Sequence, residues 1–140
     1  RVTTIWLGSP LLPQLIELEE EGKYDCSSLR RVLIGGAPLP PEVWQRAVKN
    51  FGNIFGQVYG LTENSPMCFL PPEDFVFEGS PEKVKRVHSC GKEALNVEVR
   101  IVDEWGNDVP TGQIGELIAK GEGTMYGYLN APNATQEAIK

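Results

Sequence analysis

The sequence has 140 residues, the length of one ordinary domain, and its 41% hydrophobic and 23% charged residues are typical of a folded globular chain. Its 13 Lys and Arg residues against 19 Asp and Glu residues leave a formal net charge of -6. This balance argues against a nucleic-acid partner, because no surplus of positive charge remains to neutralise phosphates.

The cysteines indicate a reducing compartment, and the hydropathy pattern indicates a chain that does not span a membrane. Cys26, Cys68 and Cys90 form no CxxC pair, so we expect free thiols rather than a zinc site or a disulfide framework. The sequence shows no signal peptide and no run of about eighteen apolar residues, so we expect no transmembrane segment. We therefore expect a cytoplasmic protein, with peripheral association with a membrane as the alternative.

Residues 1–63 alternate between apolar runs and helical patterns. The runs that predict strands are Val2–Leu7, Arg31–Ile34 and Asn53–Tyr59. Between them, apolar side chains recur every three or four residues over 11–18 and 39–51, which predicts two amphipathic helices. The order strand, helix, strand, helix, strand is typical of a parallel α/β sheet, so we assign residues 1–63 to an α/β subdomain.

The rest of the chain is predicted to contain two parts. Residues 64–94 are rich in proline and keep no periodicity, which predicts an irregular connecting segment. Residues 95–140 are predicted to form a small β-rich subdomain with a distorted, barrel-like sheet, with strands over 97–102 and 116–120 and the start of a helix over 134–139. Because the chain begins in a predicted strand and stops in a predicted helix, we expect it to be an excerpt from a longer protein.

Two loops that follow predicted strands could bind a ligand. The first, Gly35-Gly36-Ala37-Pro38, leads from a strand to a helix. In an open α/β sheet, ligands lie at the carboxyl ends of the strands, and small residues there allow a planar ring to lie against the backbone. The alternative is a tight turn in which glycine supplies a positive φ.

The second loop, QVYGLTE, runs from Gln57 to Glu63, and its Tyr59 should leave the sheet at the same edge as Gly36. A tyrosine ring can stack on a base, and the Gln57 amide can hydrogen-bond an exocyclic amine. Thr62 can donate to a phosphate oxygen, and the Glu63 carboxylate is the kind of hard ligand that Mg²⁺ takes. The alternative is a scaffold, with Tyr59 in the core, Thr62 as a helix N-cap and Glu63 as a surface acid.

Other polar groups point less clearly to chemistry. His88 is the only histidine, which excludes a metal cluster built from several histidines within these 140 residues. Its neighbours predict the edge of a strand, where the imidazole would be structural. Lys83, Lys85, Arg86 and Lys92 form a mild basic patch. This patch could meet an anionic cofactor, and a solvated loop is the alternative.

Three motifs, in this order, resemble the acyl-adenylate-forming ligase superfamily, which includes acyl-CoA synthetases, luciferases and peptide-synthetase adenylation domains. GGAPLPPEVW, at Gly35–Trp44, resembles the adenine-side loop of the family, and QVYGLTE resembles its signature YGxTE. GELIAKG at Gly115–Gly121, followed by MYGYLN and Pro132, resembles its GELxxxG and GYxNxP segment. The similarity covers nearly the whole chain.

The resemblance implies a role for each matching position. Glycine, alanine and proline of the first loop would flank one face of adenine, with Tyr59 against the other face and Gln57 near the amino group. Thr62 would contact the α-phosphate and Glu63 would bind the magnesium, and these two are the implied catalytic residues. The residues implied in nucleotide binding are Gly36, Ala37, Pro38, Gln57, Val58, Tyr59, Gly60, Leu61 and Thr62. Of these, Gly60 and Leu61 would also lie beside the carboxylate that is activated.

The implied function is an ATP-dependent acyl-CoA synthetase, an acid–thiol ligase that uses ATP, Mg²⁺ and coenzyme A. Leu61 stands where peptide-synthetase modules commonly carry proline, which favours a fatty acid as the small-molecule substrate. The alternatives are an adenylation domain for an aromatic or amino acid, and a non-catalytic ligase-like protein that binds acyl groups or nucleotide. The family's phosphate loop and C-terminal catalytic lysine are absent from these residues, so we expect the 140 residues alone to be inactive. The oligomeric state stays open.

Overall fold

The computed structural model describes residues 1–139, which form two compact units. The first unit contains Arg1–Tyr59 and Cys68–Lys92, and the second contains Gly60–Met67 and the chain from Glu93 onward. The chain therefore passes between the units more than once. Each unit is described by itself.

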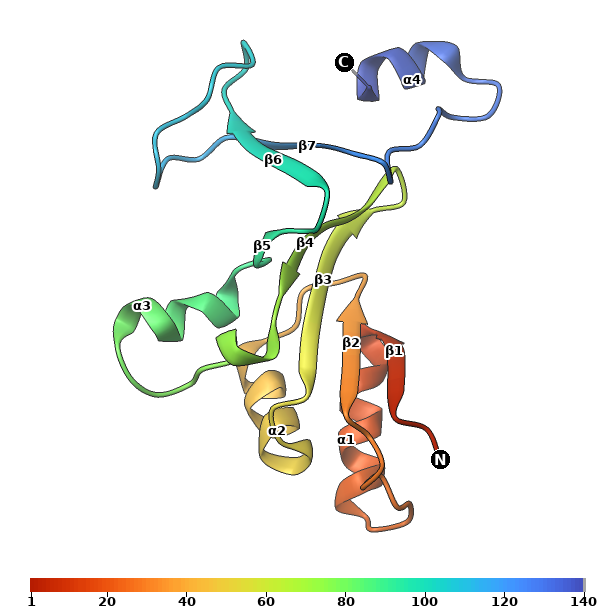
Figure 1. Ribbon diagram of the computed structural model, residues 1–140, viewed down its shortest axis with the longest axis vertical. Helices are drawn as coiled ribbons and strands as arrows, with labels where there is room; N and C mark the ends of the chain where they lie inside the picture. The colour runs from red at the N-terminus through yellow and green to blue at the C-terminus, as the bar shows by residue number, and fades with distance from the viewer. Residues whose placement is uncertain (140) are drawn as a thin grey trace. The chain divides into compact units, whose positions relative to one another are not determined.

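Parallel strands form the centre of the first unit. The strands β1 (Thr4–Gly8), β2 (Arg31–Gly35) and β3 (Phe55–Leu61) are neighbours in a five-stranded sheet of order β1-β2-β3-β4-β5 (Figure 1). Both the β1–β2 and the β2–β3 pairs are parallel. The predicted α/β class and its strand, helix, strand, helix, strand order are confirmed.

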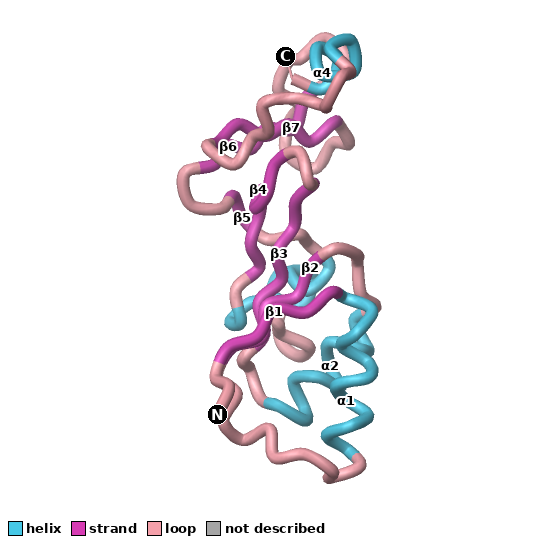
Figure 2. Tube along the Cα trace, turned by 90° about the vertical axis from the view of Figure 1, so that its right-hand side faces the viewer, coloured by secondary structure: helices cyan, strands magenta, loops and turns pink. Residues whose placement is uncertain are grey.

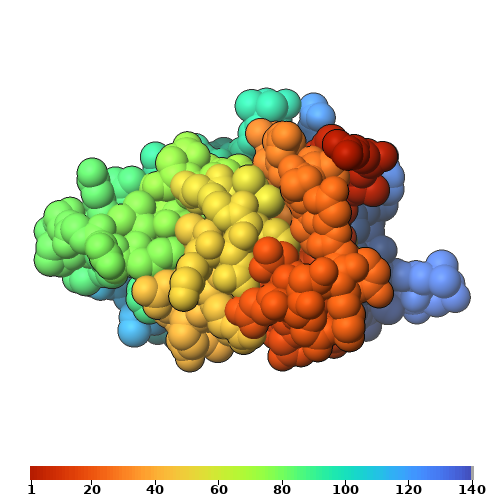
Figure 3. Space-filling view, turned by 90° about the horizontal axis from the view of Figure 1, so that it is seen from below, coloured from red at the N-terminus to blue at the C-terminus, as the bar shows by residue number. Residues whose placement is uncertain are grey.

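Two helices cover one face of these three strands. The helices α1 (Leu12–Glu20), which follows the 3-10 turn η1 (Ser9–Leu11), and α2 (Pro41–Phe51) lie on the same side of the strands in Figure 2. In the space-filling view from below, the orange surface of α1 adjoins the yellow surface of α2 (Figure 3). At this contact Arg46 of α2 donates two hydrogen bonds to the Glu20 carboxylate of α1, with N–O distances of 2.5 and 3.0 Å.

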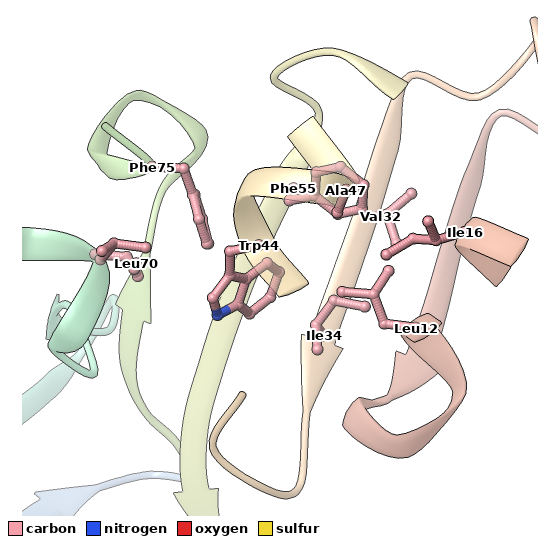
Figure 4. Close-up of a cluster of buried hydrophobic side chains, with 10 residues drawn as sticks. Leu12, Ile16, Val32, Ile34, Trp44, Ala47, Phe55, Leu70 and Phe75 are labelled. Carbon is pink, nitrogen blue, oxygen red and sulfur yellow. The ribbon is translucent and has the colours of Figure 1, made fainter. Parts of the chain in front are cut away.

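The hydrophobic core lies between the helices and the strands. Leu12 and Ile16 are one helical turn apart in α1, and both are fully buried. The Trp44 ring of α2 lies 4.6 Å from the ring of Phe75 and 6.1 Å from that of Phe55, measured between centroids. Figure 4 shows Leu12 and Ile16 facing Ile34 and Val32, and Phe75 facing Trp44; Ala47 and Leu70 belong to the same cluster. Burial of each large side chain contributes about 1.5–3 kcal/mol to the free energy of folding. The core therefore stabilises the strands from which the candidate loops extend.

Residues 64–94 differ from the irregular segment that was predicted. Asn64–Leu70 form strand β4, which is separated from β3 by two residues and neighbours it in the sheet. The strand escaped prediction because it buries the adjacent residues Met67 and Cys68 instead of alternate ones, and because Pro66 suggested a break. The remaining elements of this segment are η2 (Pro72–Asp74), α3 (Pro81–Val84), η3 (Lys85–His88) and β5 (Lys92–Glu93). His88 thus ends a 3-10 helix, and its predicted place at a strand edge is wrong.

The second unit contains a small antiparallel sheet and a short helix. The strands β6 (Val97–Val102) and β7 (Glu116–Gly121) pair from Val97 opposite Gly121 to Val102 opposite Glu116. The helix α4 (Pro132–Ala138) lies within two residues of its predicted start. The two strands predicted in this part are therefore confirmed, and they form a two-stranded sheet. None of the helices in residues 1–139 has the length and apolar character that crossing a membrane requires.

Candidate functional site

The first candidate loop begins where β2 ends, beside the middle of the longer strand β3. Gly35 pairs with Val58 in the parallel register, so Gly36 follows the end of β2 beside Tyr59. Because β3 continues to Leu61, Tyr59 lies within the strand, and the prediction that it leaves the sheet at this edge is wrong. Gly36 has a φ of 98°, a conformation that favours glycine, so the turn interpretation is correct. That interpretation is compatible with binding, because the side chains of Ala37 and Pro38 are exposed and a Cβ at Gly36 would meet no atom within 4 Å.

A buried serine that the sequence did not single out anchors this loop. The Ser9 hydroxyl is 1% exposed and lies 2.6 Å from the Ala37 carbonyl oxygen and 3.1 Å from the Gly35 carbonyl oxygen. It also accepts a hydrogen bond from the Ala37 amide at 3.3 Å. Ser9 therefore fixes the backbone on both sides of Gly36. The only signal in the sequence was a small polar residue two positions after a predicted strand.

The side chains of β3 alternate between the two faces of the sheet. Gln57 pairs with the buried Ile34, so Gln57 and Tyr59 lie on the same face of the sheet as Ile34. The helices cover this face near the beginning of β3. Tyr59 keeps 37% of its surface exposed, so the alternative that placed it in the core is wrong. Val58 lies on the other face and is half-buried. A tyrosine and an amide on one face form a surface on which a planar base can stack and hydrogen-bond.

Thr62 and Glu63 form the turn between β3 and β4, in the second unit (Figure 1). A strand follows this turn instead of a helix, so the alternative of Thr62 as a helix N-cap is wrong. Thr62 is exposed, and its hydroxyl makes no hydrogen bond within the described part of the chain. Before the turn, Gly60 is half-buried and Leu61 is 53% exposed.

The Glu63 carboxylate is held by a tyrosine from a distant part of the chain. The Tyr128 hydroxyl donates to Glu63 Oε1, with 2.5 Å between the oxygens. This hydrogen bond lowers the pKa of Glu63, with help from its own backbone amide, and raises the pKa of Tyr128. The Glu63 carboxylate is therefore ionised at neutral pH and is oriented by a hydrogen bond. The alternative interpretation, a surface acid without a specific contact, does not describe it.

The donors around the turn fit a magnesium ion that arrives with phosphates. No group of three or more His, Cys, Asp or Glu side chains in residues 1–139 could hold a metal by itself. Mg²⁺ is usually bound through one or two carboxylates together with substrate phosphates and water. A single ionised carboxylate at Glu63 is consistent with that kind of site.

The turn is also joined to the segment after β7 through its main chain. The Met125 amide donates to the Glu63 carbonyl oxygen at 2.7 Å. Asn64, which is 4% exposed, donates through its side-chain amide to Thr124 Oγ1 at 2.9 Å and to the Ala119 carbonyl oxygen at 3.3 Å. Tyr128 belongs to a sequence motif that was recognised, and Asn64 directly follows another, but nothing in the motifs showed that these two segments meet.

The comparisons with known proteins identify a family to which the chain is similar over nearly its whole length. The family model described as AMP-binding enzyme matches residues 1–129. The chain is 36% identical over 141 residues to 4-coumarate–CoA ligase 4 of Arabidopsis thaliana, covering 99% of this chain and 24% of that protein. It is 32% identical over 140 residues to a medium/long-chain-fatty-acid–CoA ligase of Mycobacterium tuberculosis, covering 100% of this chain and 24% of that protein.

A solved structure shows the same fold with a nucleotide bound. O-succinylbenzoate coenzyme A synthetase from Bacillus subtilis, in complex with AMP, matches with a TM-score of 0.79 and 27% identity. The match covers 99% of this chain and 26% of that one. The chain thus spans about a quarter of the length of each of these proteins.

Proposed function

This chain belongs to the AMP-binding enzyme family, and on that premise we propose that the full-length protein is an acid–thiol ligase. In the first step, a carboxylate would attack the α-phosphorus of ATP, giving acyl-AMP and pyrophosphate. In the second step, the thiol of coenzyme A would attack the acyl carbon, and AMP would leave. The observation that carries the proposal is the exposed turn in which the Thr62 hydroxyl stands beside the ionised carboxylate of Glu63.

The turn would act on the phosphates. Both reactants of the first step are anions, so the protein must mainly position them and stabilise their charge. We assign the Thr62 hydroxyl to donation to the α-phosphate and the Glu63 carboxylate to binding of Mg²⁺. Mg²⁺ held there would neutralise charge on the phosphate oxygens.

The remaining residues would bind the rest of the nucleotide and the acid. The first loop would flank one face of adenine, and the Tyr59 ring would stack on the other, with the Gln57 amide beside the amino group. The open backbone at Gly36 and the partly exposed Tyr59 ring support these roles. The complete proposed nucleotide set is Gly36, Ala37, Pro38, Gln57, Val58, Tyr59, Gly60, Leu61 and Thr62. Gly60 and Leu61 would also lie beside the carboxylate being activated.

For the substrate we propose a fatty acid or another aliphatic acid. Leu61 in place of proline supports an acyl-CoA synthetase, and the similarity to a fatty-acid–CoA ligase supports the aliphatic class. The similarity to 4-coumarate–CoA ligases favours an aromatic acid as the second candidate. A cytoplasmic location is also proposed, and the free thiols of Cys26 and Cys90 support it.

A substrate panel tests the function and the substrate class together. The full-length protein would be incubated with ATP, Mg²⁺, coenzyme A and one acid from each of three classes: aliphatic, hydroxycinnamic and amino acids. We expect AMP release and acyl-CoA formation to be fastest with the aliphatic acids. Faster turnover of a hydroxycinnamic acid would establish the second candidate. Preference for an amino acid, or nucleotide binding with no AMP release from any acid, would refute the proposed ligase.

A further inference from the structure

The contact between Tyr128 and Glu63 joins residues that are 65 positions apart in the sequence. The Tyr128 hydroxyl donates to Oε1 of the carboxylate, so Oε2 is the oxygen that Tyr128 does not contact. A glutamate side chain on a turn would otherwise rotate freely, and Mg²⁺ requires near-ideal octahedral geometry. A hydroxyl that holds one oxygen therefore limits where the other oxygen can lie.

The first turn of α4 holds the backbone of Tyr128 through a hydrogen bond. Its backbone amide donates to Thr135 Oγ1 at 2.9 Å, and the Thr135 hydroxyl donates to the Ala131 carbonyl oxygen at 3.0 Å. Gly127 has a φ of 151°, and a Cβ there would lie 2.7 Å from Thr135 Cγ2. Only glycine admits this approach, so the Gly127-Tyr128 pair of the motif is explained by its contact with Thr135.

The main chain of Glu63 is held by the same segment. The Met125 amide donates to the Glu63 carbonyl oxygen, and Asn64 and Thr124 form both a side-chain hydrogen bond and an antiparallel bridge. Residues 124–128 thus contact the backbone and the side chain of Glu63 together. A rigid frame of this kind is what an oriented metal ligand requires, because partners that hold the ligands set metal affinity.

We infer that Tyr128 is a positioning residue for the magnesium site, acting through its hydroxyl on Glu63. The inference rests on the proposed function of Glu63 as the metal ligand. Tyr128 touches neither the nucleotide nor the acid in this scheme. Its contribution is to keep the carboxylate in the orientation that binds the ion.

The test is Tyr128→Phe in the full-length protein, because this change removes the hydroxyl and keeps the ring. We expect the Mg²⁺ concentration for half-maximal AMP release to rise about tenfold or more, with the rate at saturating Mg²⁺ close to wild type. A direct readout is Mn²⁺ affinity in the presence of a non-hydrolysable ATP analogue, measured by electron paramagnetic resonance of the free ion, and we expect it to weaken by the same factor. Mn²⁺ serves as the probe because it takes the same oxygen ligands.

The matched control is Tyr126→Phe, which removes a hydroxyl from a fully exposed ring in the same segment. We expect this variant to keep wild-type Mg²⁺ dependence and Mn²⁺ affinity. A Tyr128→Phe protein that resembles this control, while Glu63→Gln weakens Mn²⁺ binding, would overturn the positioning role and leave the proposed function standing. If Glu63→Gln also binds Mn²⁺ as the wild type does, both the metal role of Glu63 and the inference are wrong.

Discussion

Thr62 and Glu63 are neighbours in one turn, yet their side chains are held very differently. Glu63 is fixed through its main chain and its carboxylate, whereas the Thr62 hydroxyl has no hydrogen-bond partner within residues 1–139. A fixed carboxylate suits a metal ion with strict geometry. A free hydroxyl suits a group that arrives with the substrate, so substitution at Thr62 should affect the reaction and not the fold.

Thr62→Val in the full-length protein is expected to slow ATP–pyrophosphate exchange by about ten- to a hundredfold. The reason is that a hydrogen bond to a charged group is worth about 1.5–3 kcal/mol, and about 1.4 kcal/mol corresponds to a factor of ten in rate. The melting temperature should stay near that of the wild type. Thr62→Ser, which keeps a hydroxyl, is the control and should retain most of the rate. Wild-type exchange in the valine variant would mean that Thr62 only shapes the turn.

At the scale of elements, local periodicity predicted most of the fold. The apolar spacings of α1 and α2 and the runs of β1, β2, β3, β6 and β7 were sufficient, because each depends on residues close together in the sequence. Strand β4 was missed, since its pairing with β3 makes it a strand despite a proline and two adjacent buried side chains. The same limit applies to Ser9 and Tyr128, whose partners lie 26 to 65 positions away.

The contact between α1 and α2 should weaken in acid. Hydrogen bonds from Arg46, and then from Asn50, lower the pKa of Glu20 from its ordinary value of 4.5 to about 2. Because the pKa is lower in the folded state, the contribution of Glu20 to stability is complete above pH 4.5 and is lost as the pH falls toward 2. Glu20→Gln should therefore destabilise the protein at pH 6, and the difference from wild type should shrink as the pH approaches 2.

Thermal melts of both proteins across this pH range measure that difference. Glu19→Gln lies on the same helix outside the ion pair and is the matched control, for which we expect a smaller difference at pH 6. The Glu20 carboxylate is exposed, so the effect should be modest and should diminish in high salt. A Glu20→Gln difference that is constant from pH 6 to pH 2 would contradict a role for the ionised carboxylate.

At the scale of the whole molecule, each compact unit is considered by itself, with the proposed residues that it contains. Gly36 and Tyr59 belong to the first unit, Thr62 and Glu63 belong to the second, and the chain passes from one to the other between Tyr59 and Gly60. The chain also spans about a quarter of the length of the relatives that it matches. We therefore propose that catalysis needs groups beyond those present in these 140 residues.

Residues 1–140 expressed alone should show no ATP–pyrophosphate exchange with any carboxylic acid. The physical reason is that the proposed set supplies one carboxylate and one hydroxyl to the phosphates, too few groups to stabilise the charge of the transition state. The measurement is isotope exchange, with circular dichroism to show that the piece is folded and the full-length protein as the positive control. Robust exchange from the folded piece would contradict the assignment of roles.

The bonds between the turn at Glu63 and the segment after β7 also bear on how this protein can be recombined with its relatives. Thr62–Asn64 and Thr124–Tyr128 meet through hydrogen bonds of both main chain and side chains, so they should be inherited together. A chimera with a single crossover between residues 64 and 124 takes its turn from one parent and its tyrosine from the other. For parents that differ in these two segments, such hybrids should fold and yet demand more magnesium than either parent, whereas a double crossover that carries both segments should restore the parental requirement.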